Sequence, residues 1–351
     1  MTLNHKYVHS KFKLNGFNYA IEDLKGLASN FLKSGSANEK QIALFLENWF
    51  NNDDYIELKT SGSTGKPKDI KVKKQAMINS AVATGTFFNL KPGNTALHCL
   101  PSQYIAGKMM LVRALVLGLE IDVIEPALHL KINPDKHYNF SAMVPLQIEN
   151  VYKNCNNIDT IIVGGSPVSS SLKSKLTTIN TSVFETYGMT ETVSHIALKK
   201  LTSSENYFKI LPNVSISLDH RGCLVIDAPL LNNDKIITND LVKIHSETTF
   251  EWLGRFDNVV NSGGVKLFPE QIEAKLQNKI QNRFFIASQP DDTLGSKLIL
   301  VIESDSNILN DSVFSELSKF EKPKTIYAVK QFIETASGKI QRKKTLNLIS
   351  F

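Results

Sequence analysis

The feature that most constrains this chain is a short segment rich in glycine, hydroxyl side chains and lysine, Thr60-Ser61-Gly62-Ser63-Thr64-Gly65-Lys66-Pro67-Lys68. Glycine lets backbone N–H groups approach a ligand closely, and hydroxyls, N–H groups and lysines bind phosphate oxygens. The flanking residues, 55–60 and 70–73, alternate apolar and polar side chains as half-buried strands do. The sequence therefore predicts a hairpin whose tip faces a polyphosphate.

The spacing within this segment differs from that of a Walker loop. That motif places four residues between its first glycine and Gly-Lys, followed by Ser or Thr. Here two residues separate Gly62 from Gly65, and Pro67 follows Lys66. A solvated turn is the alternative interpretation. The order of residues resembles the phosphate loop of the adenylate-forming superfamily, which includes acyl-CoA synthetases, luciferases and the adenylation domains of peptide synthetases.

Length and charge narrow the functional classes. The 351 residues, 42% of them hydrophobic, are enough for one large or two medium cores. The net charge of +6 suits anionic substrates such as ATP and coenzyme A. Because the lysines are scattered and no zinc-finger, RNP or helix-turn-helix pattern occurs, we expect no nucleic-acid partner. The sequence leaves open whether the chain is a monomer or a homodimer.

Three isolated cysteines, Cys99, Cys155 and Cys223, have the spacing of neither a disulfide framework nor a zinc site. They indicate reduced thiols, and we therefore expect a cytoplasmic location. Residues 1–16 are polar and predict no signal peptide. The longest apolar stretch, 109–124, is too short and too charged to predict a membrane span.

Hydrophobic periodicity predicts alternating helices and strands, and hence an α/β architecture with a largely parallel sheet. The predicted helices lie within 20–50, as a pair separated at Ser34-Gly35-Ser36, and at 76–88 and 105–118. The predicted strands lie at 95–100, 120–124, 140–145, 160–163 and 181–186. Short β segments follow at 214–218, 223–226, 236–237 and 242–244, and further strands at 284–287 and 297–302.

Two predicted strands end in loops that suit a ligand, because open α/β sheets bind ligands at the carboxyl ends of their strands. Gly164-Gly165-Ser166 follows the first, although a tight turn alone explains these residues equally well. The second runs into Glu185-Thr186-Tyr187-Gly188-Met189-Thr190-Glu191-Thr192. Here Thr190 is suited to a phosphate and Glu191 to Mg²⁺, and a helix N-cap is the alternative.

Four motifs in order, from about residue 55 to 344, are similar to the adenylate-forming superfamily. Besides the phosphate loop and 187–192, they are 252–258 and 335–342. The resemblance implies a large α/β N-terminal adenylate-forming domain, 1–254, with mixed and parallel sheets. It also implies a small mobile α+β C-terminal domain, 255–351, joined by a hinge. Because the first fifty residues are short, we expect a reduced or missing N-terminal subdomain.

The resemblance also implies roles for individual residues. Lys339, Thr190 and Glu191 would be catalytic, with Glu191 as the protein ligand of Mg²⁺. Asp257 would be the hinge, and Gly263 and Gly264 would border coenzyme A. The residues expected to bind ATP and AMP are Thr60, Ser61, Gly62, Ser63, Thr64, Gly65, Lys66, Lys68, Gly164, Gly165, Ser166, Glu185, Thr186, Tyr187, Gly188, Met189, Asp240 and Arg255.

Two positions depart from the family pattern. Asn239 stands where the family has glycine in its Thr-Gly-Asp loop, and Ile333 stands where many members have proline. The first departure leaves the shape of the loop before Asp240 open.

The activity implied is ATP-dependent ligation of a carboxylic acid to coenzyme A through an acyl adenylate. The short chain and residues 187–195 look like o-succinylbenzoate–CoA ligases of menaquinone synthesis. Since that acid is a dicarboxylate, we expect a second cation in the acyl pocket, with Lys108 as the candidate beside Ser194 and His195. A solvated helix position is the alternative for Lys108.

Three other functions remain open. They are a different aryl- or acyl-CoA ligase, an adenylation domain that loads a carrier protein, and a non-catalytic adenylate-binding or basic interaction protein. The presence of both Glu191 and Lys339 argues against the last.

Overall fold

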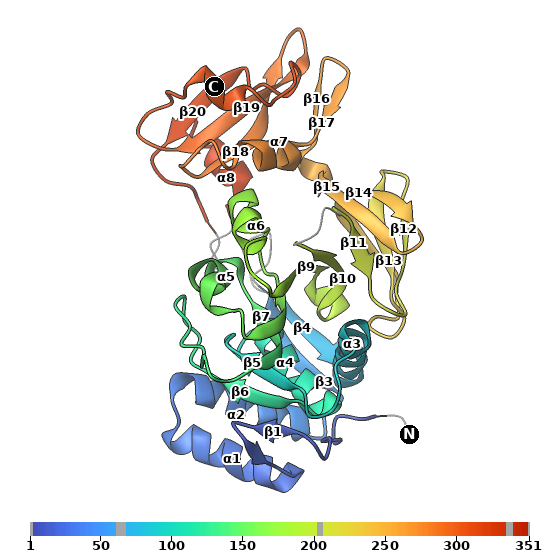
Figure 1. Cartoon of the computed structure of the whole chain (residues 1–351). Helices are drawn as coiled ribbons and strands as arrows, with labels where there is room; N and C mark the ends of the chain where they lie inside the picture. Colours follow the sequence, from blue (N-terminus) through green and yellow to red (C-terminus); the bar gives the residue numbers. More distant parts are fainter. Residues whose placement is uncertain (1–2, 61–67, 202–205, 335–339, 350–351) are drawn as a thin grey trace.

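The computed structural model describes residues 3–60, 68–201, 206–334 and 340–349. Its centre is a mixed sheet of 13 strands in the order β12-β13-β14-β15-β11-β10-β9-β8-β7-β5-β6-β1-β2. The chain runs from two helices at one end, past this sheet, to a separate group of strands and helices at the other (Figure 1). The α/β class predicted from the sequence is confirmed.

One half of the sheet is largely parallel. It consists of β1 (Lys13–Leu14), β2 (Phe17–Asn18), β5 (Thr95–His98), β6 (Glu120–Val123), β7 (Tyr138–Met143), β8 (Ile158–Val163) and β9 (Ser182–Gly188). Strands β1 and β5 to β9 pair in parallel, and only β2 runs antiparallel at the edge. Along β8, Ile161 and Val163 pack into one core and Ile162 into another. Both faces of this half are therefore covered, which explains the continuous apolar run.

The other half of the sheet is antiparallel. It consists of β10 (His195–Lys200), β11 (Phe208–Ile210), β12 (Ser215–Leu218), β13 (Cys223–Asp227), β14 (Ile236–Ser246) and β15 (Thr249–Arg255). The sequence pattern predicted two short segments, 236–237 and 242–244, with a loop between them. That prediction was wrong, because β14 is one strand that contains Thr238, Asn239 and Asp240. Pairing with β13 and β15 on both sides keeps these polar residues extended.

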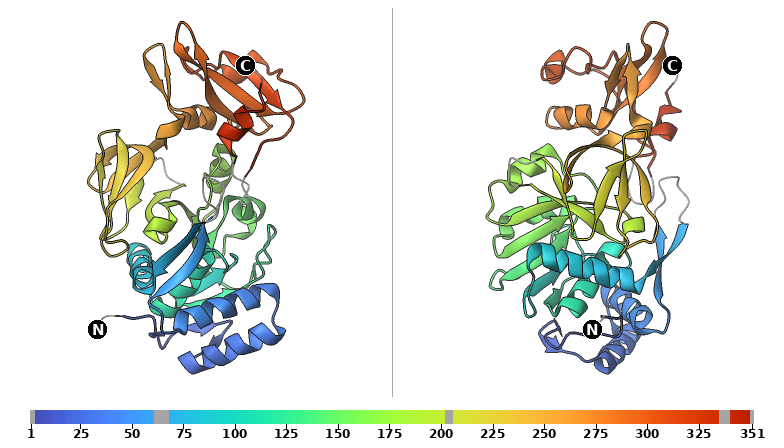
Figure 2. Two further views of the ribbon diagram at one scale, coloured as in Figure 1. Left: turned by 180° about the vertical axis from the view of Figure 1, so that it is seen from behind. Right: turned by 90° about the vertical axis from the view of Figure 1, so that its right-hand side faces the viewer.

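Helices cover the sheet on both faces (Figure 2). They are α1 (Ile21–Ser34), α2 (Ala37–Phe50), α3 (Lys74–Phe88), α4 (Ile105–Leu117), α5 (Pro145–Val151) and α6 (Ser170–Leu176). Single 3₁₀ turns lie at Tyr152–Asn154 and Thr190–Thr192. The predicted break between the first two helices is confirmed: Ser36 caps α2 in a reciprocal capping box with Glu39.

The predicted hairpin is also confirmed. Strands β3 (Tyr55–Thr60) and β4 (Lys68–Lys73) pair antiparallel without a register shift, from Tyr55 opposite Lys73 to Thr60 opposite Lys68. The residues at its tip, 61–67, lie outside the described residues.

Residues from 256 onward form cores of their own. The elements are a 3₁₀ turn (Phe256–Asn258), β16 (Val260–Ser262), β17 (Val265–Leu267), α7 (Pro269–Leu276), β18 (Phe284–Asp291), β19 (Gly295–Glu303), a 3₁₀ turn (Asp311–Phe314), β20 (Thr325–Val329) and α8 (Arg342–Leu346). Along β19, Leu300 packs into one core and Val301 into a second. We propose the division at residues 254 and 255 on this basis.

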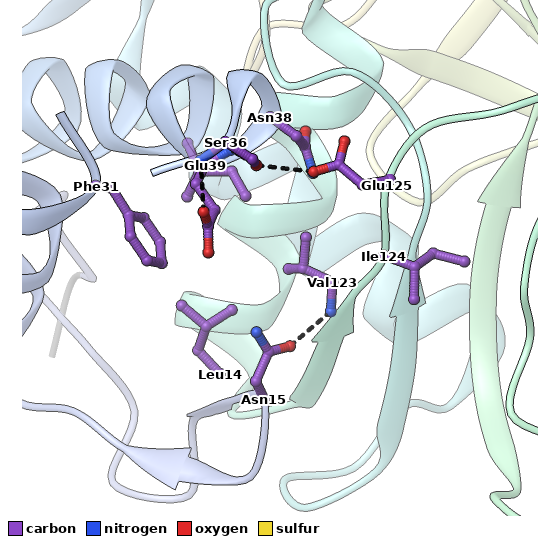
Figure 3. A pocket seen from close by; sticks show the side chains of 10 residues that line it. Leu14, Asn15, Phe31, Ser36, Asn38, Glu39, Val123, Ile124 and Glu125 are labelled. Carbon is purple, nitrogen blue, oxygen red and sulfur yellow. Dashed lines mark hydrogen bonds between the residues drawn. The ribbon is translucent and has the colours of Figure 1, made fainter. Parts of the chain in front are cut away.

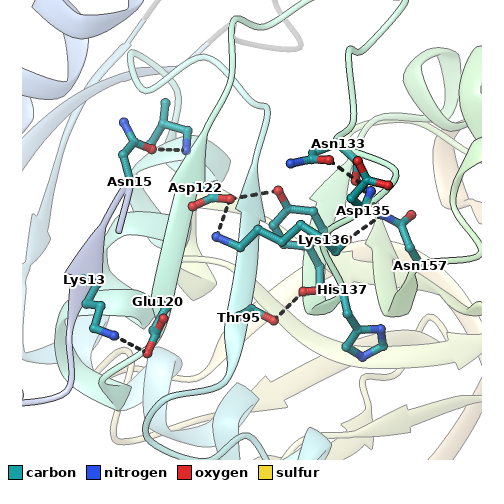
Figure 4. A network of polar contacts seen from close by, with 12 residues as sticks. Lys13, Asn15, Thr95, Glu120, Asp122, Asn133, Asp135, Lys136, His137 and Asn157 are labelled. Carbon is teal, nitrogen blue, oxygen red and sulfur yellow. Dashed lines mark hydrogen bonds and ion pairs between the residues drawn. The ribbon is translucent and has the colours of Figure 1, made fainter. Parts of the chain in front are cut away.

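A polar network joins the starts of several parallel strands (Figure 4). Asp122 accepts a hydrogen bond of 2.8 Å from Tyr138 Oη and pairs with Lys136 Nζ at 2.6 Å. Lys13 pairs with Glu120 at 2.8 Å across β1 and β6. Burial and Asp122 raise the pKa of Tyr138, so the phenol stays a donor. These contacts lie near the amino ends of the parallel strands, whereas the loops expected to bind ligand follow the carboxyl ends.

No helix in the described ranges is long and apolar enough to cross a membrane. Cys99, Cys155 and Cys223 are buried and unbonded to one another.

A half-buried carboxylate, Glu273, predicts a pH effect on stability. Glu273 on α7 accepts from Ile286 N at 2.8 Å and from Arg342 Nη2 of α8 at 2.7 Å. Burial raises the pKa of Glu273 to about 7, against the opposing effect of Arg342. Between the unfolded pKa of 4.5 and about 7 the folded state therefore holds the extra proton. This contribution to stability is present at low pH and is lost as the pH rises through 7.

We expect Glu273→Gln to remove most of the change in the free energy of unfolding between pH 5 and pH 8. At 1.36 kcal/mol per pKa unit, that change is on the order of 3 kcal/mol in the wild type. Denaturant midpoints measured at several pH values check this. The matched control is Glu316→Gln, whose side chain is 66% exposed. Equal slopes for the wild type and Glu273→Gln would contradict the assignment.

Candidate active site

The carboxyl ends of β8 and β9 bring two predicted ligand loops together. A Cβ on Gly164 would collide with Thr186 Oγ1, so the loop after β8 approaches β9 as only glycine permits. Glu185 pairs with Lys199 Nζ at 2.7 Å and accepts from Val168 N at 3.3 Å. These contacts hold the predicted residues 164–166 against 185–187. The side chain of Glu185 is therefore engaged within the protein.

Asp240 on β14 is the polar centre of the site. Its side chain is 8% exposed and accepts from Tyr187 Oη at 2.7 Å. It also accepts from Trp252 Nε1 and Arg255 Nη1, both at 3.2 Å. Burial, followed by the charge of Asp240, raises the pKa of Tyr187, so its hydroxyl remains a donor. Three predicted nucleotide-binding residues, Tyr187, Asp240 and Arg255, thus meet although they come from three strands.

Two phenylalanine rings pack against the aromatic ring of Tyr187. It lies 5.2 Å from the Phe250 ring in an edge contact and 5.7 Å from that of Phe208. Such packing fixes the ring orientation before any ligand binds. The sequence placed Tyr187 in the site, but did not predict these supports.

Asn239, the departure from the family glycine, contacts the predicted hinge. Its Nδ2 donates to Asp257 Oδ2 at 2.5 Å. Next to this contact, Gly254 has φ +147°, and a Cβ there would meet the Glu270 side chain of α7. The segment that joins β15 to the following elements is thus held by contacts from β14 and α7. Asp257 as the pivot stays a prediction.

The turn after Met189 is strained. Val193 has φ +67° and ψ −55°, a γ-turn conformation that is rare for a β-branched residue. Thr192 is fully buried beneath it, and its Oγ1 accepts from Met189 N at 2.9 Å and lies 2.7 Å from Ser194 O. This turn places Thr190 and an exposed Glu191 at one side of the site. Strained residues that are held so firmly are typical of functional sites.

A buried arginine lies behind this turn. Arg113 on α4 is 2% exposed, and its Nε has no partner among the described residues. Its Nη2 lies 3.5 Å from Ser194 Oγ, which in turn lies 2.7 Å from Ser80 Oγ. Burial lowers the pKa of Arg113 to about 10, so the guanidinium stays charged near neutral pH. No carboxylate in the described part of the chain pairs with it.

His195 belongs to the same cluster. It is 6% exposed, and its Nε2 lies 3.4 Å from Thr84 Oγ1. Burial and the charge of Arg113 lower the pKa of His195 well below 6.5, so the imidazole is neutral. The sequence singled out Ser194 and His195 but missed Arg113, Ser80 and Thr84. An arginine within the apolar stretch 109–124 was the available signal.

Lys108, the cation that the sequence predicted for the acyl pocket, lies on the same helix as Arg113, α4. Its Nζ donates to Ser102 O at 2.7 Å and to Gln103 O at 3.2 Å, and lies 5.9 Å from the Phe45 ring centroid. Burial lowers the pKa of Lys108 to about 8. The ammonium therefore holds the loop that precedes α4. The role of Lys108 toward an acid stays a prediction.

Two further predicted residues that the structure describes, Gly263 and Gly264, are not brought to these clusters. Gly263 and Gly264 form the turn between β16 and β17, with φ +55° and +80°. Lys339 and the phosphate-loop residues 61–66 lie outside the described residues, and nothing is described of the side chains of Thr60 and Lys68. Among the described residues, no three His, Cys, Asp or Glu side chains are grouped so that they could hold a metal ion.

Comparison with known proteins agrees with this architecture. The model of the family described as AMP-binding enzyme matches residues 58–228. A solved acyl-CoA synthetase (AMP-forming)/AMP-acid ligase II-like protein from Dyadobacter fermentans is 37% identical to this chain, with a TM-score of 0.62. The alignment covers 93% of this chain and 98% of that one. The chain therefore belongs to the AMP-binding enzyme family, the adenylate-forming superfamily that the motifs predicted.

Two further relatives are more distant. The curated 2-succinylbenzoate–CoA ligase of Listeria monocytogenes serovar 1/2a is 25% identical over 92% of this chain and 76% of its own length. The o-succinylbenzoate CoA synthetase of Bacillus subtilis, solved with its acyl-adenylate intermediate, is 20% identical with a TM-score of 0.71. That alignment covers 82% of this chain and 68% of the other. The likeness to the Bacillus subtilis structure supports the fold described for this chain.

We expect Thr192→Val to destabilise the protein by about 1–3 kcal/mol, because an isosteric methyl leaves the half-buried Met189 N–H without its hydroxyl partner. Turnover should fall as well, since the strained turn loses its support. Denaturant unfolding and steady-state kinetics check both effects. Thr177→Val is the control, because Thr177 is exposed, follows the last residue of α6 and donates from Oγ1 to Ser174 O of that helix. Unchanged stability of Thr192→Val would contradict the role given to this hydroxyl.

Proposed function

We propose that this protein is an AMP-forming acid–CoA ligase that converts o-succinylbenzoate to its coenzyme A thioester. The curated relatives that share 22–25% identity over most of the chain carry this activity in their names. The single observation that favours a dicarboxylate is the buried Arg113 beside Ser194 and His195, which has no carboxylate partner among the described residues.

The proposed reaction has two steps. One carboxylate of the acid attacks the α-phosphorus of ATP and displaces pyrophosphate, which gives an acyl adenylate. The thiol of coenzyme A then loses its proton, attacks the acyl carbon and displaces AMP. Catalysis of this kind consists largely of positioning and of neutralising charge, so no protein nucleophile is required. The buried cysteines are not involved.

We assign roles to the chain's own residues on the geometry above. Asp240 and Arg255 would hold the ribose. Each oxygen of the Asp240 carboxylate can accept hydrogen bonds beyond those that it already accepts from the protein. Glu191 is exposed and would contribute one oxygen to the Mg²⁺ that the ATP phosphates coordinate. Thr190 and Lys339 would contact the phosphates.

Arg113 is our candidate for the second carboxylate of the acid. Burying an unpaired charge costs several kcal/mol, so a cation in this position points to an anion that binds there. Ser194 and Ser80 supply hydroxyl donors beside it, and the neutral His195 adds no competing charge. Lys108, in contrast, already donates to two carbonyls.

The cytoplasmic location, the absence of a nucleic-acid partner and the oligomeric state stay predictions.

The test is coenzyme A-dependent release of AMP across aromatic, fatty and keto-dicarboxylic acids, with Arg113→Met and Lys108→Met as a matched pair. We expect o-succinylbenzoate to be the best substrate. Arg113→Met should raise its KM roughly 10- to 150-fold through loss of a charge-assisted contact. The KM for ATP and the rates with benzoate-like monocarboxylates should change little.

Stability separates this role from a structural one. Replacing an unpaired buried cation by an apolar side chain of similar size should leave the melting temperature unchanged or raise it. A dicarboxylate KM that rises only in Lys108→Met would return the role to Lys108. An unchanged KM in both variants would favour a different aryl- or acyl-CoA ligase.

The two half-reactions give a second test. Lys339→Ala should slow adenylate formation about 10²–10³-fold and leave thioester formation from pre-made acyl adenylate largely intact, because a mobile C-terminal domain would carry Lys339 away after the first step. Pyrophosphate exchange and single-turnover thioester formation measure the steps separately. Equal losses in both steps would contradict domain alternation.

A further inference from the structure

Polar contacts at the helical end of the molecule join parts of one packed unit. Ser36 Oγ at the start of α2 donates to Glu125 at 2.8 Å, and Asn15 Oδ1 accepts from Val123 N at 2.8 Å (Figure 3). Both contacts border a cavity of about 210 Å³ and tie α2 and the chain after β1 to the end of β6. The polar contacts at the predicted hinge are different, because they connect two groups of elements with separate cores.

Two neighbouring residues of β14 serve these two groups. Asp240 is buried and bonds to Tyr187 in the candidate active site. Since side chains alternate along a strand, the partly exposed Asn239 lies on the opposite face of the sheet. There its Nδ2 donates to Asp257 Oδ2 at 2.5 Å. Asp257 belongs to the 3₁₀ turn that follows β15 and leads to β16. A strand that contributes to the site therefore also holds the predicted hinge.

Arg221, in the turn between β12 and β13, orients the Asn239 amide. Its Nη1 donates to Asn239 Oδ1 at 3.2 Å, so the amide NH₂ faces the carboxylate of Asp257. Arg221 is itself fixed, since its Nε donates to Asp219 Oδ2 at 2.7 Å. Its guanidinium also lies 5.3 Å from the centroid of the Phe256 ring, within the range of a cation–π contact.

Arg221 and Asn239, here called the hinge clasp, thus hold two consecutive residues of the chain that leaves β15, Phe256 and Asp257. Hinge residues absorb the change of φ and ψ when domains move. A rotation about the N–Cα bond of Asp257 also moves its carboxylate relative to β14, so the clasp opposes this rotation. A glycine at position 239, as in the family pattern, has no side chain to reach Arg221 or Asp257.

The orientation that the clasp holds keeps the predicted coenzyme A residues away from the site. Gly263 and Gly264 form the turn between β16 and β17, and Gly263 N donates to Leu294 O at 3.0 Å, within the C-terminal elements. Figure 1 shows β16 and β17 at the upper end of the molecule, away from β9. Because these glycines are predicted to border coenzyme A, thioester formation requires the C-terminal elements to turn about the hinge.

We propose that Arg221 and Asn239 are positioning residues for the thioester step, because they hold the hinge in the present orientation and restrain its rotation. The role in the reaction rests on the proposed function, whereas the restraint itself is measurable without any substrate. Loss of one such hydrogen bond should change the ratio of the two orientations about fivefold.

Spin-label distance measurements on the full chain test the restraint. Labels at Glu47→Cys and Asp305→Cys occupy exposed positions on either side of the hinge, and the three native cysteines are buried. We expect one main distance in this labelled parent chain. Asn239→Asp keeps an acceptor for Arg221 but places a carboxylate against Asp257. The fraction of molecules at a second distance should therefore rise about fivefold or more.

A reciprocal exchange separates the clasp from a general loss of structure. Asn239→Asp combined with Asp257→Asn places one donor opposite one acceptor again, and should return the distances toward those of the labelled parent. Asn233→Asp, the same change at an exposed position before β14, is the control and should leave the distances unchanged. Unchanged distances in Asn239→Asp, or a change that the double variant does not reverse, would overturn the clasp and leave the ligase assignment intact.

Single-turnover thioester formation from pre-made o-succinylbenzoyl adenylate tests the role in the reaction. Asn239→Asp should speed this step about fivefold, while pyrophosphate exchange, which reports adenylate formation, stays equal or falls. A merely structural defect would slow both steps. Unchanged or slower thioester formation in Asn239→Asp, with pyrophosphate exchange intact, would overturn the positioning role. Absence of pyrophosphate exchange in the wild type would instead refute the proposed ligase, and the spin-label distances would still decide whether the clasp exists.

Discussion

The buried carboxylate of Asp240 connects the two halves of the main sheet. It accepts from Tyr187, which ends the parallel half, and from Trp252 and Arg255 in the antiparallel half. A carboxylate buried this deeply is tolerated only when hydrogen bonds and a cation compensate its lost hydration. The four side chains therefore depend on one another. Their arrangement fixes where β9 ends and where the chain leaves β15, and both ends border the candidate active site.

The candidate active site contains residues that lower the stability of the protein, together with packing and hydrogen bonds that hold those residues in place. Val193 is strained, Arg113 is a buried cation without a carboxylate partner in the described chain, and Glu191 is exposed beside them. None of these features stabilises the isolated protein. The supports around them, such as the fully buried Thr192 and the aromatic packing of Tyr187, hold them in place. Features of this kind are typical of binding sites, and they agree with the proposed ligase.

The position of the candidate active site follows from the topology of the sheet. The parallel strands β5 to β9 all end at one edge, so loops with polar groups gather there. Ser194, in the turn that follows β9, lies 3.5 Å from the buried guanidinium of Arg113 on α4. The end of a strand and a helix distant in the chain thus meet at this edge.

The sequence by itself determined the class of fold, the family and most element positions, because hydrophobic periodicity and the four motifs are local signals. It placed Tyr187, Asp240 and Arg255 in one site by resemblance. Only the tertiary structure decided that Asp240 lies within a continuous strand, since pairing with β13 and β15 overrides the local polar pattern. Only tertiary structure likewise revealed Arg113 as the buried cation, because its burial depends on helices and strands distant in the chain.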